Sequence, residues 1–180
     1  MFSSLFSFIF NFVTSALGCL LVVRGWAYAC GVSQHESLMI SIRQLTDWLV
    51  RPLRRVVPTK GRWYWPAWVA ALLVALVVVL VYGRAAVLVK PLIWITPFFI
   101  VLRWLLEMMI WGILGSIILN WASPRHPLLN VFWMLFEPII VPVRRILPSV
   151  KNVDLGSIAV IIGLNLILIF LVLPITSIIY

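Results

Sequence analysis

Long apolar segments constrain this chain more than any other feature of its sequence. Hydrophobic residues make up 64% of the 180 residues and charged residues only 11%, whereas a soluble domain is about half apolar and about a quarter charged. A helix of about 20 residues crosses the roughly 30 Å hydrocarbon layer of a bilayer. We therefore predict an all-α membrane protein with four transmembrane helices, at about residues 5–28, 66–82, 98–121 and 155–178.

The sequence also contains an internal repeat. At an offset of 90 positions, QLTDWLVRPLRRVVP (residues 44–58) aligns with MLFEPIIVPVRRILP (residues 134–148), matching a carboxylate, two prolines and an arginine pair. We predict a first repeat over residues 1–86, an interfacial linker over 87–97 and a second repeat over 98–180. Each repeat holds two spans, so the repeats are parallel and both basic segments lie on one face of the membrane.

The distribution of basic residues predicts the topology. The net charge of +9 comes from fourteen Lys and Arg against five Asp and Glu. Most of the basic residues lie between the first and second spans and between the third and fourth. The positive-inside rule places these two connections in the cytoplasm and both termini outside. Such charges meet anionic phospholipids, and we expect no nucleic-acid partner.

Each basic segment follows a helical segment. In residues 37–50, Leu38, Ile42, Leu45 and Leu49 recur at helical spacing opposite polar residues, which predicts an amphipathic helix that lies in the interface or re-enters the membrane. Its counterpart at 128–136 is apolar almost all round, which indicates a segment that is buried deeper or packed against protein.

The basic segments RPLRRVVP (51–58) and VPVRRILP (141–148) are bracketed by prolines. Because proline lacks an amide donor and disfavours helix at the preceding residue, we predict two short, stiff turns that present arginines at headgroup depth. These arginines either anchor the chain to anionic lipid or dock a partner protein, and the two roles are compatible. The candidate binding residues are Arg51, Arg54, Arg55, Arg144 and Arg145.

Two further sets of charged residues are candidates. Asp47 and Glu137 are matched carboxylates near the membrane, where they either handle an ion across the repeat axis or pair structurally with neighbouring arginines. Arg103 and Glu107 lie four residues apart within the third span and can neutralise each other on one helix face. The first repeat has no counterpart of this intramembrane pair, which favours a role in helix packing or partner binding.

The sequence contains none of the motifs that would indicate an enzyme. GxSxG, HExxH, Walker A and GxGxxG are all missing. Cys19 and Cys30 form no CxxC and are interpreted as packing residues, while His35 and His126 are interpreted as loop residues rather than as metal ligands. We expect a protein without catalytic activity, cofactor or metal.

Two stretches, one in each repeat, resemble the YggT family, also called the YlmG or Ycf19-like family, of bacterial and plastid membranes. The first is RGWAYACGV leading into QLTDWLVRPLRRVVP, and the second is ILNWASPRHPLLN leading into FEPIIVPVRRILPSVKNVDLGSIAVII. The pattern occurs twice, as in the two-repeat bacterial members. The first repeat departs from it in TKGRWYWPA, where the second retains Asp154 and Ser157.

The resemblance implies a small multispanning protein of the bacterial inner membrane. Its relatives are associated with membrane-protein or cytochrome assembly, with cell division or nucleoid organisation, and with tolerance of osmotic stress. Our first hypothesis is a non-enzymatic scaffold or assembly factor that acts in a membrane-protein complex or a homo-oligomer. The alternative is a small ion-handling protein that uses Asp47 and Glu137.

Overall fold

The computed structural model describes residues 2–57, 59, 63–82, 94–145 and 154–176, and these residues form helices and connections without a strand. The predicted all-α class is confirmed. The linker predicted at 87–97 lies mostly outside the described residues. The elements are α1 (Phe2–Ala29), α2 (Ser37–Val56), α3 (Trp65–Tyr82), α5 (Thr96–Ala122), α6 (Leu128–Arg144), α7 (Leu155–Ile167), η2 (Leu168–Val172) and α8 (Leu173–Thr176).

Four helical segments in the described part of the chain are long and apolar enough to span a membrane, as predicted. They are Leu5–Ala29, Trp65–Tyr82, Thr96–Ala122 and Leu155–Thr176. The last one combines α7, the π-helical turn η2 and α8. Pro174 follows the π-helical turn, and a proline offers no amide to the carbonyl four residues earlier, so local widening of the helix is expected near it.

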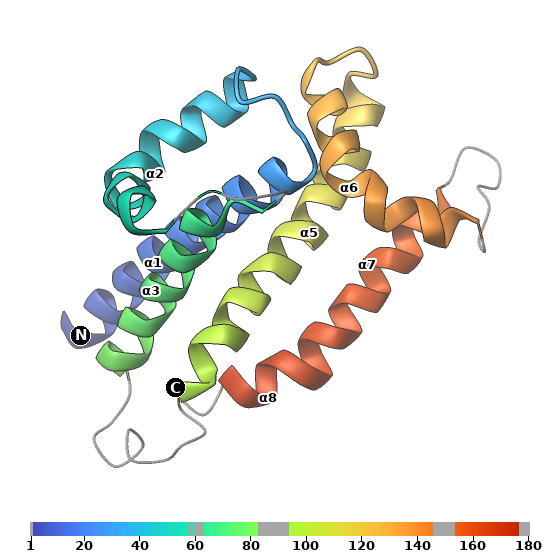
Figure 1. Cartoon of the computed structure of the whole chain (residues 1–180). Coiled ribbons are helices and arrows are strands. Elements are labelled where there is room, and N and C mark those ends of the chain that lie inside the picture. Colours follow the sequence, from blue (N-terminus) through green and yellow to red (C-terminus); the bar gives the residue numbers. More distant parts are fainter. Residues whose placement is uncertain (1, 58, 60–62, 83–93, 146–153, 177–180) are drawn as a thin grey trace.

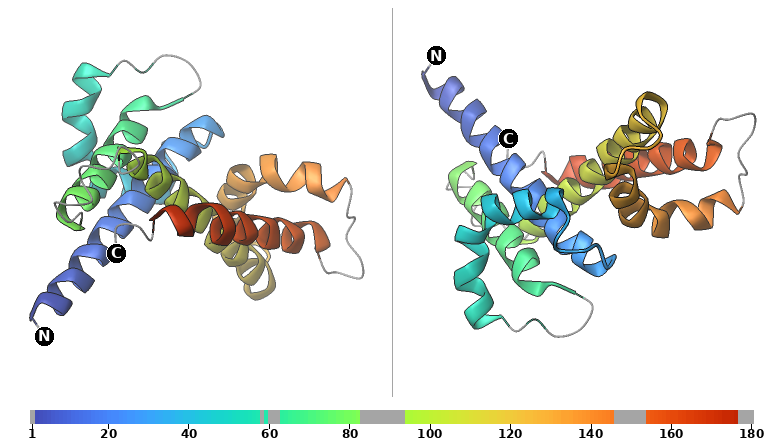
Figure 2. Two further views of the ribbon diagram at one scale, coloured as in Figure 1. Left: turned by 90° about the horizontal axis from the view of Figure 1, so that it is seen from below. Right: turned by 90° about the horizontal axis from the view of Figure 1, so that it is seen from above.

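The helices form two lobes, which correspond to the two repeats. The first lobe consists of α1, α2 and α3, and the second lobe consists of α5, α6, α7, η2 and α8. Figure 2 shows α2 and α3 on one side of the central helices α1 and α5, and α6 and α7 on the other side. Both α2 and α6 lie towards the same end of the long helices, while the start of α1 and the end of α8 lie towards the opposite end (Figure 1). The lobes are therefore arranged in tandem and in parallel.

The two repeats bury equivalent positions. Three of the four buried residues of α2 have buried counterparts in α6 at the offset of 90 positions. These pairs are Met39 with Leu129, Thr46 with Phe136, and Val50 with Ile140. The same faces of α2 and α6 thus pack against their own lobes, although the side chains differ.

The prediction of two stiff turns is wrong. Within the described residues, the segments predicted as turns are largely helical, because α2 continues to Val56 and α6 to Arg144 despite the prolines inside them. A proline removes one intrahelical hydrogen bond and bends a helix without having to end it, and Figures 1 and 2 show both helices changing direction along their length. Along α2, Ile42 and Thr46 are buried, whereas Leu45 is 57% exposed.

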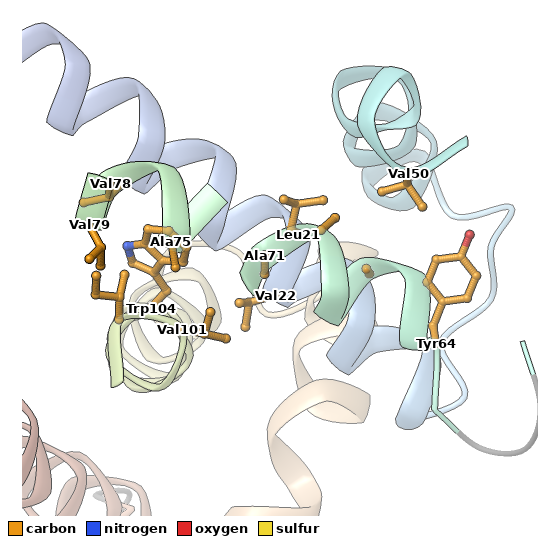
Figure 3. Packing of buried hydrophobic residues seen from close by; sticks show 13 residues of the cluster. Leu21, Val22, Val50, Tyr64, Ala71, Ala75, Val78, Val79, Val101 and Trp104 are labelled. Carbon is orange, nitrogen blue, oxygen red and sulfur yellow. The ribbon is translucent and has the colours of Figure 1, made fainter. Parts of the chain in front are cut away.

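Close side-chain packing joins α3 to the central helices α1 and α5. In the cluster of Figure 3, Trp104 of α5 lies against Ala75, Val78 and Val79 of α3. The Tyr82 hydroxyl donates a hydrogen bond to the Ser7 carbonyl at 2.7 Å, which ties α3 to α1. Without a hydrophobic driving force between helices in lipid, such close packing and such hydrogen bonds are what hold spans together.

Gly31 ends α1 and directs the chain towards α2. Its φ is +76°, a left-handed conformation that suits glycine. The Val32 amide donates to the Ala27 carbonyl at 3.0 Å, and the Gly31 amide to the Tyr28 carbonyl at 3.2 Å. This is the Schellman pattern, and it allows α2 to fold back over the end of α1.

Candidate functional site

A buried arginine organises the first lobe. Arg24 of α1 is 6% exposed, and its Nη2 lies 2.8 Å from Asp47 Oδ1 of α2. Its Nη1 donates to the Thr46 hydroxyl at 2.8 Å, and its Nη2 to the Tyr64 hydroxyl at 3.4 Å. In Figure 3 the Tyr64 ring stands beneath α2 with its hydroxyl directed towards it. Arg24 therefore joins α1, α2 and the start of α3.

Asp47 pairs with a neighbouring arginine, as the structural interpretation of this carboxylate predicted. Its Oδ2 lies 3.5 Å from Nε of Arg51, one turn later on α2, in addition to its contact with Arg24. Glu137 is exposed and forms no ion pair with any other described residue. The two matched carboxylates thus have different surroundings, and this difference gives no support to the ion-handling alternative.

Sequence reasoning missed Arg24. The charge count considered the connections between spans, whereas Arg24 lies inside the first apolar run. A charged residue within a span is costly in lipid and is usually paired or functional, so the signal was present. Its partners Asp47 and Tyr64 are 23 and 40 positions away, which local patterns do not reveal.

The second lobe has an ion pair of its own. The Arg144 guanidinium at the end of α6 donates to both carboxylate oxygens of Asp154, the residue that caps the start of α7. The Asp154 carboxylate also accepts a hydrogen bond from the Ser157 amide at 3.3 Å, and Arg144 Cζ lies 4.9 Å from the ring centre of Trp133. Burial alone would raise the pKa of Asp154, but the hydrogen bonds from Arg144 and Ser157 outweigh it and lower that pKa.

Two cavities occupy equivalent places in the lobes. The first-lobe cavity has a volume of about 150 Å³, and the second-lobe cavity, with about 600 Å³, is bordered mainly by apolar side chains of α5, α6 and α7. Four lining residues of the first cavity have counterparts lining the second at the offset of 90 positions. They are Arg24 with Leu114, Arg43 with Trp133, Arg54 with Arg144, and Tyr64 with Asp154.

The arginine pairs divide into two roles. The first member of each pair, Arg54 or Arg144, lines the cavity of its lobe. The second member, Arg55 or Arg145, is exposed. Arg51 is also exposed, although it contacts Asp47. The five predicted binding residues therefore form no single group, since Arg144 is already neutralised by Asp154.

The intramembrane pair predicted in the third span is confirmed. Arg103 Nε lies 2.7 Å from Glu107 Oε1 on α5, and the two side chains are 33% and 29% exposed. Glu107 borders an open crevice together with Ser15 and Cys19 of α1. A charged pair that is partly exposed on a spanning helix is unfavourable in contact with lipid.

The described residues offer no obvious metal centre. They contain no group of three or more His, Cys, Asp or Glu side chains suited to a metal ion. His126 accepts a hydrogen bond from the Leu128 amide at 3.2 Å through its Nδ1, His35 is exposed, and the Cys30 thiol donates a hydrogen bond to the Leu135 carbonyl at 3.8 Å.

Four apolar helices in two parallel lobes, each with a bent basic helix at the same end, define a multi-pass α-helical membrane protein built by duplication. The CCB3/YggT family model matches residues 3–85 and 95–175, so both lobes carry the family pattern. The chain belongs to the CCB3/YggT family.

Curated relatives of the chain are bacterial. "Uncharacterized protein YggT" of Escherichia coli is 29% identical over 167 residues, which are 89% of this chain and 86% of the relative. "Uncharacterized protein in proC 3'region" of Vibrio alginolyticus is 26% identical over 151 residues, 81% of this chain and 82% of the relative. No solved structure is significantly similar to this chain.

Proposed function

We propose that this protein is a non-enzymatic scaffold or assembly factor of the bacterial inner membrane, which binds anionic phospholipid or a partner membrane protein at the cytoplasmic face. The observation that carries the proposal is the matched position of Arg55 and Arg145. Both are exposed at the ends of equivalent helices, and neither forms an ion pair within the described part of the chain.

Lipid electrostatics supports this orientation. The cytoplasmic leaflet carries a negative surface potential, and each basic residue near it contributes about 1 kcal/mol of attraction. Arg51, Arg55 and Arg145 are exposed, and they lie in or directly after helices at the same end of the molecule (Figure 1). Their combined attraction favours anionic headgroups or an acidic surface of a partner.

The pair Arg103–Glu107 supports a partner within the membrane. Both side chains are about one-third exposed on a spanning helix, and charge exposed to hydrocarbon is unfavourable. A helix of a partner protein or of a second copy that covers this face would remove the pair from lipid. The scaffold role thus has a contact surface in the membrane as well as at its boundary.

The proposal is tested by isolating the protein from its membrane in mild detergent and identifying bound lipids and proteins by mass spectrometry. We expect phosphatidylglycerol or cardiolipin together with a defined set of membrane proteins. The double variant Arg55→Gln/Arg145→Gln should retain less of both, whereas Arg125→Gln, which changes an exposed arginine in the loop between α5 and α6, should match the wild type. Equal recovery from both variants would contradict the proposal.

A further inference from the structure

The first-lobe cavity carries more positive charge than its surroundings balance. Arg24 of α1 and Arg43 and Arg54 of α2 all line it. Among the described residues, Asp47 is the one carboxylate that pairs with any of these three arginines, and its partner is Arg24. Arg43 and Arg54 therefore face the cavity without a carboxylate, although like charges brought together at the edge of a low-dielectric region repel each other strongly.

The second lobe shows what a balanced site at this place looks like. There, Arg144 occupies the position equivalent to Arg54, and the carboxylate of Asp154 satisfies it. The first lobe has Tyr64 in place of that carboxylate, and it has arginines in place of Leu114 and Trp133. Relative to the second lobe, the first-lobe cavity has gained two cations and lost one anion.

We propose that the first-lobe cavity is a binding site for a phosphate group, either in a phospholipid headgroup or as free phosphate. The site rests on the proposed function where the phosphate belongs to a lipid, and it adds a defined pocket with Arg43 and Arg54 as the binding residues. The bound phosphate occupies the place that the Asp154 carboxylate has in the second lobe.

The remaining side chains suit this ligand. Guanidinium groups bind phosphate oxygens through two parallel hydrogen bonds, and the hydroxyls of Tyr28 and Tyr64 and the amide of Gln34 add neutral donors along the wall. Arg24 already donates to Thr46, Tyr64 and Asp47, so Arg43 and Arg54 are the lining arginines that are left to bind the phosphate. A volume of about 150 Å³ is comparable to a cavity that holds benzene, which admits a phosphate group and leaves acyl chains outside.

The site is tested by adding probes to the full chain purified in detergent. The probes are inorganic phosphate and dioctanoyl phosphatidylglycerol, with zwitterionic dioctanoyl phosphatidylcholine as the comparison, and binding is measured by native mass spectrometry and by the thermal unfolding midpoint. We expect a saturable shift with a phosphate-bearing anion and at least about tenfold weaker binding in Arg43→Gln and in Arg54→Gln, since each removes a charge-assisted contact. Arg125→Gln should bind like the wild type.

The substitution Tyr64→Asp provides a second, independent test. It introduces the carboxylate that the second lobe has at this position, which should pair with Arg54 and exclude the anion. We expect the variant to lose the anion-dependent thermal shift. If Tyr64→Asp does not fold, Arg54→Gln decides the question, because Arg54 is exposed at the edge of the cavity and its replacement disturbs no buried packing.

The outcomes separate the two sources of phosphate and the two proposals. Saturation by inorganic phosphate indicates free phosphate, and a response to phosphatidylglycerol alone indicates a lipid headgroup. If neither probe binds, or if Arg43→Gln and Arg54→Gln bind like the wild type, the cavity is not a phosphate site. If lipid is lost only in Arg55→Gln/Arg145→Gln, the proposed function stands and the cavity site is overturned. If phosphate binding is lost only in Arg43→Gln and Arg54→Gln, the cavity site stands and the role proposed for Arg55 and Arg145 is overturned.

Discussion

At the scale of single residues, the charged network around Arg24 joins α1, α2 and the residue before α3 in the first lobe. A buried guanidinium requires both a counter-charge and hydrogen-bond acceptors. Asp47 supplies the charge and Thr46 supplies a hydroxyl. The matched residue Glu137 neutralises no buried arginine among the described residues. Equivalent positions in the two repeats therefore contribute unequally to stability.

We predict that Asp47→Asn lowers the free energy of unfolding by about 3 kcal/mol, because it leaves Arg24 buried without a counter-charge. The double variant Arg24→Gln/Asp47→Asn should recover part of this loss. Glu137→Gln is the matched control and should change stability by less than about 0.5 kcal/mol. The measurement is unfolding in detergent, and equal effects of the two carboxylate substitutions would show that the network around Arg24 is unimportant.

The ion pair between Arg144 and Asp154 predicts a pH dependence. The pKa of Asp154 is lowered in the folded protein from its ordinary value of 3.8, so its contribution to stability is fully present above about pH 4 and is lost as the pH falls through the lowered pKa. At pH 7, Asp154→Asn should be less stable than the wild type by about 2 kcal/mol, because an ionic hydrogen bond is lost.

Unfolding midpoints of both proteins, measured from pH 7 down to pH 2, test this prediction. The difference between wild type and Asp154→Asn should be constant above about pH 4 and shrink below it. A difference that is the same at all pH values would mean that the ionised carboxylate does not hold the two helices together.

At the scale of elements, the bent helix α6 depends on close approach to the span α5. In the second lobe, Gly112 of α5 permits this approach, since a Cβ at this position would lie 2.1 Å from Cζ of Phe136 on α6. Phe136 is only 2% exposed and cannot easily move aside. The position of α6, and with it that of Arg144, therefore depends on the absence of a side chain at residue 112.

We predict that Gly112→Ala destabilises the protein by about 1–3 kcal/mol through overpacking against Phe136. Gly115→Ala is the control on the same helix, because a Cβ there meets nothing within 4 Å. Alanine favours helix over glycine by up to about 1 kcal/mol, so the control should be neutral or stabilising. Thermal unfolding of both variants in detergent distinguishes these outcomes, and a stabilising Gly112→Ala would show that α6 is free to shift.

At the scale of the whole molecule, the parallel lobes restrict the topology. Each lobe enters and leaves on the same side of the membrane, because it contains two spanning segments. The start of α1 and the end of α8 lie at the end opposite to α2 and α6 (Figure 1). From the positive-inside rule we propose that the arginine-bearing end faces the cytoplasm.

We predict that alkaline phosphatase fused after residue 180 or after residue 86 is active, since both fusion points lie outside the cytoplasm in this topology. Fluorescent protein fused at these two points should remain dark. Activities of the two reporters in intact cells measure the orientation. The opposite pattern at both points would invert the topology and remove the cytoplasmic assignment of the arginine surface.

The sequence by itself determined the membrane class, the four spans and the duplication. Runs of apolar residues that are long enough to cross a bilayer have few alternatives, since backbone groups in lipid must be satisfied within a helix. The pair Arg103–Glu107 was predictable for a similar reason, because residues four positions apart always meet on one helix face.

Only the tertiary structure decided where α2 and α6 bend and which charged residues of different helices pair. The prolines disfavour helix locally, but packing of the buried faces keeps both helices continuous. The contacts of Arg24 with Asp47 and Tyr64, and the difference between the two cavities, depend on how segments far apart in sequence fold together. Charge pairing between different helices is set by distances of a few ångströms in three dimensions, and no local pattern encodes those distances.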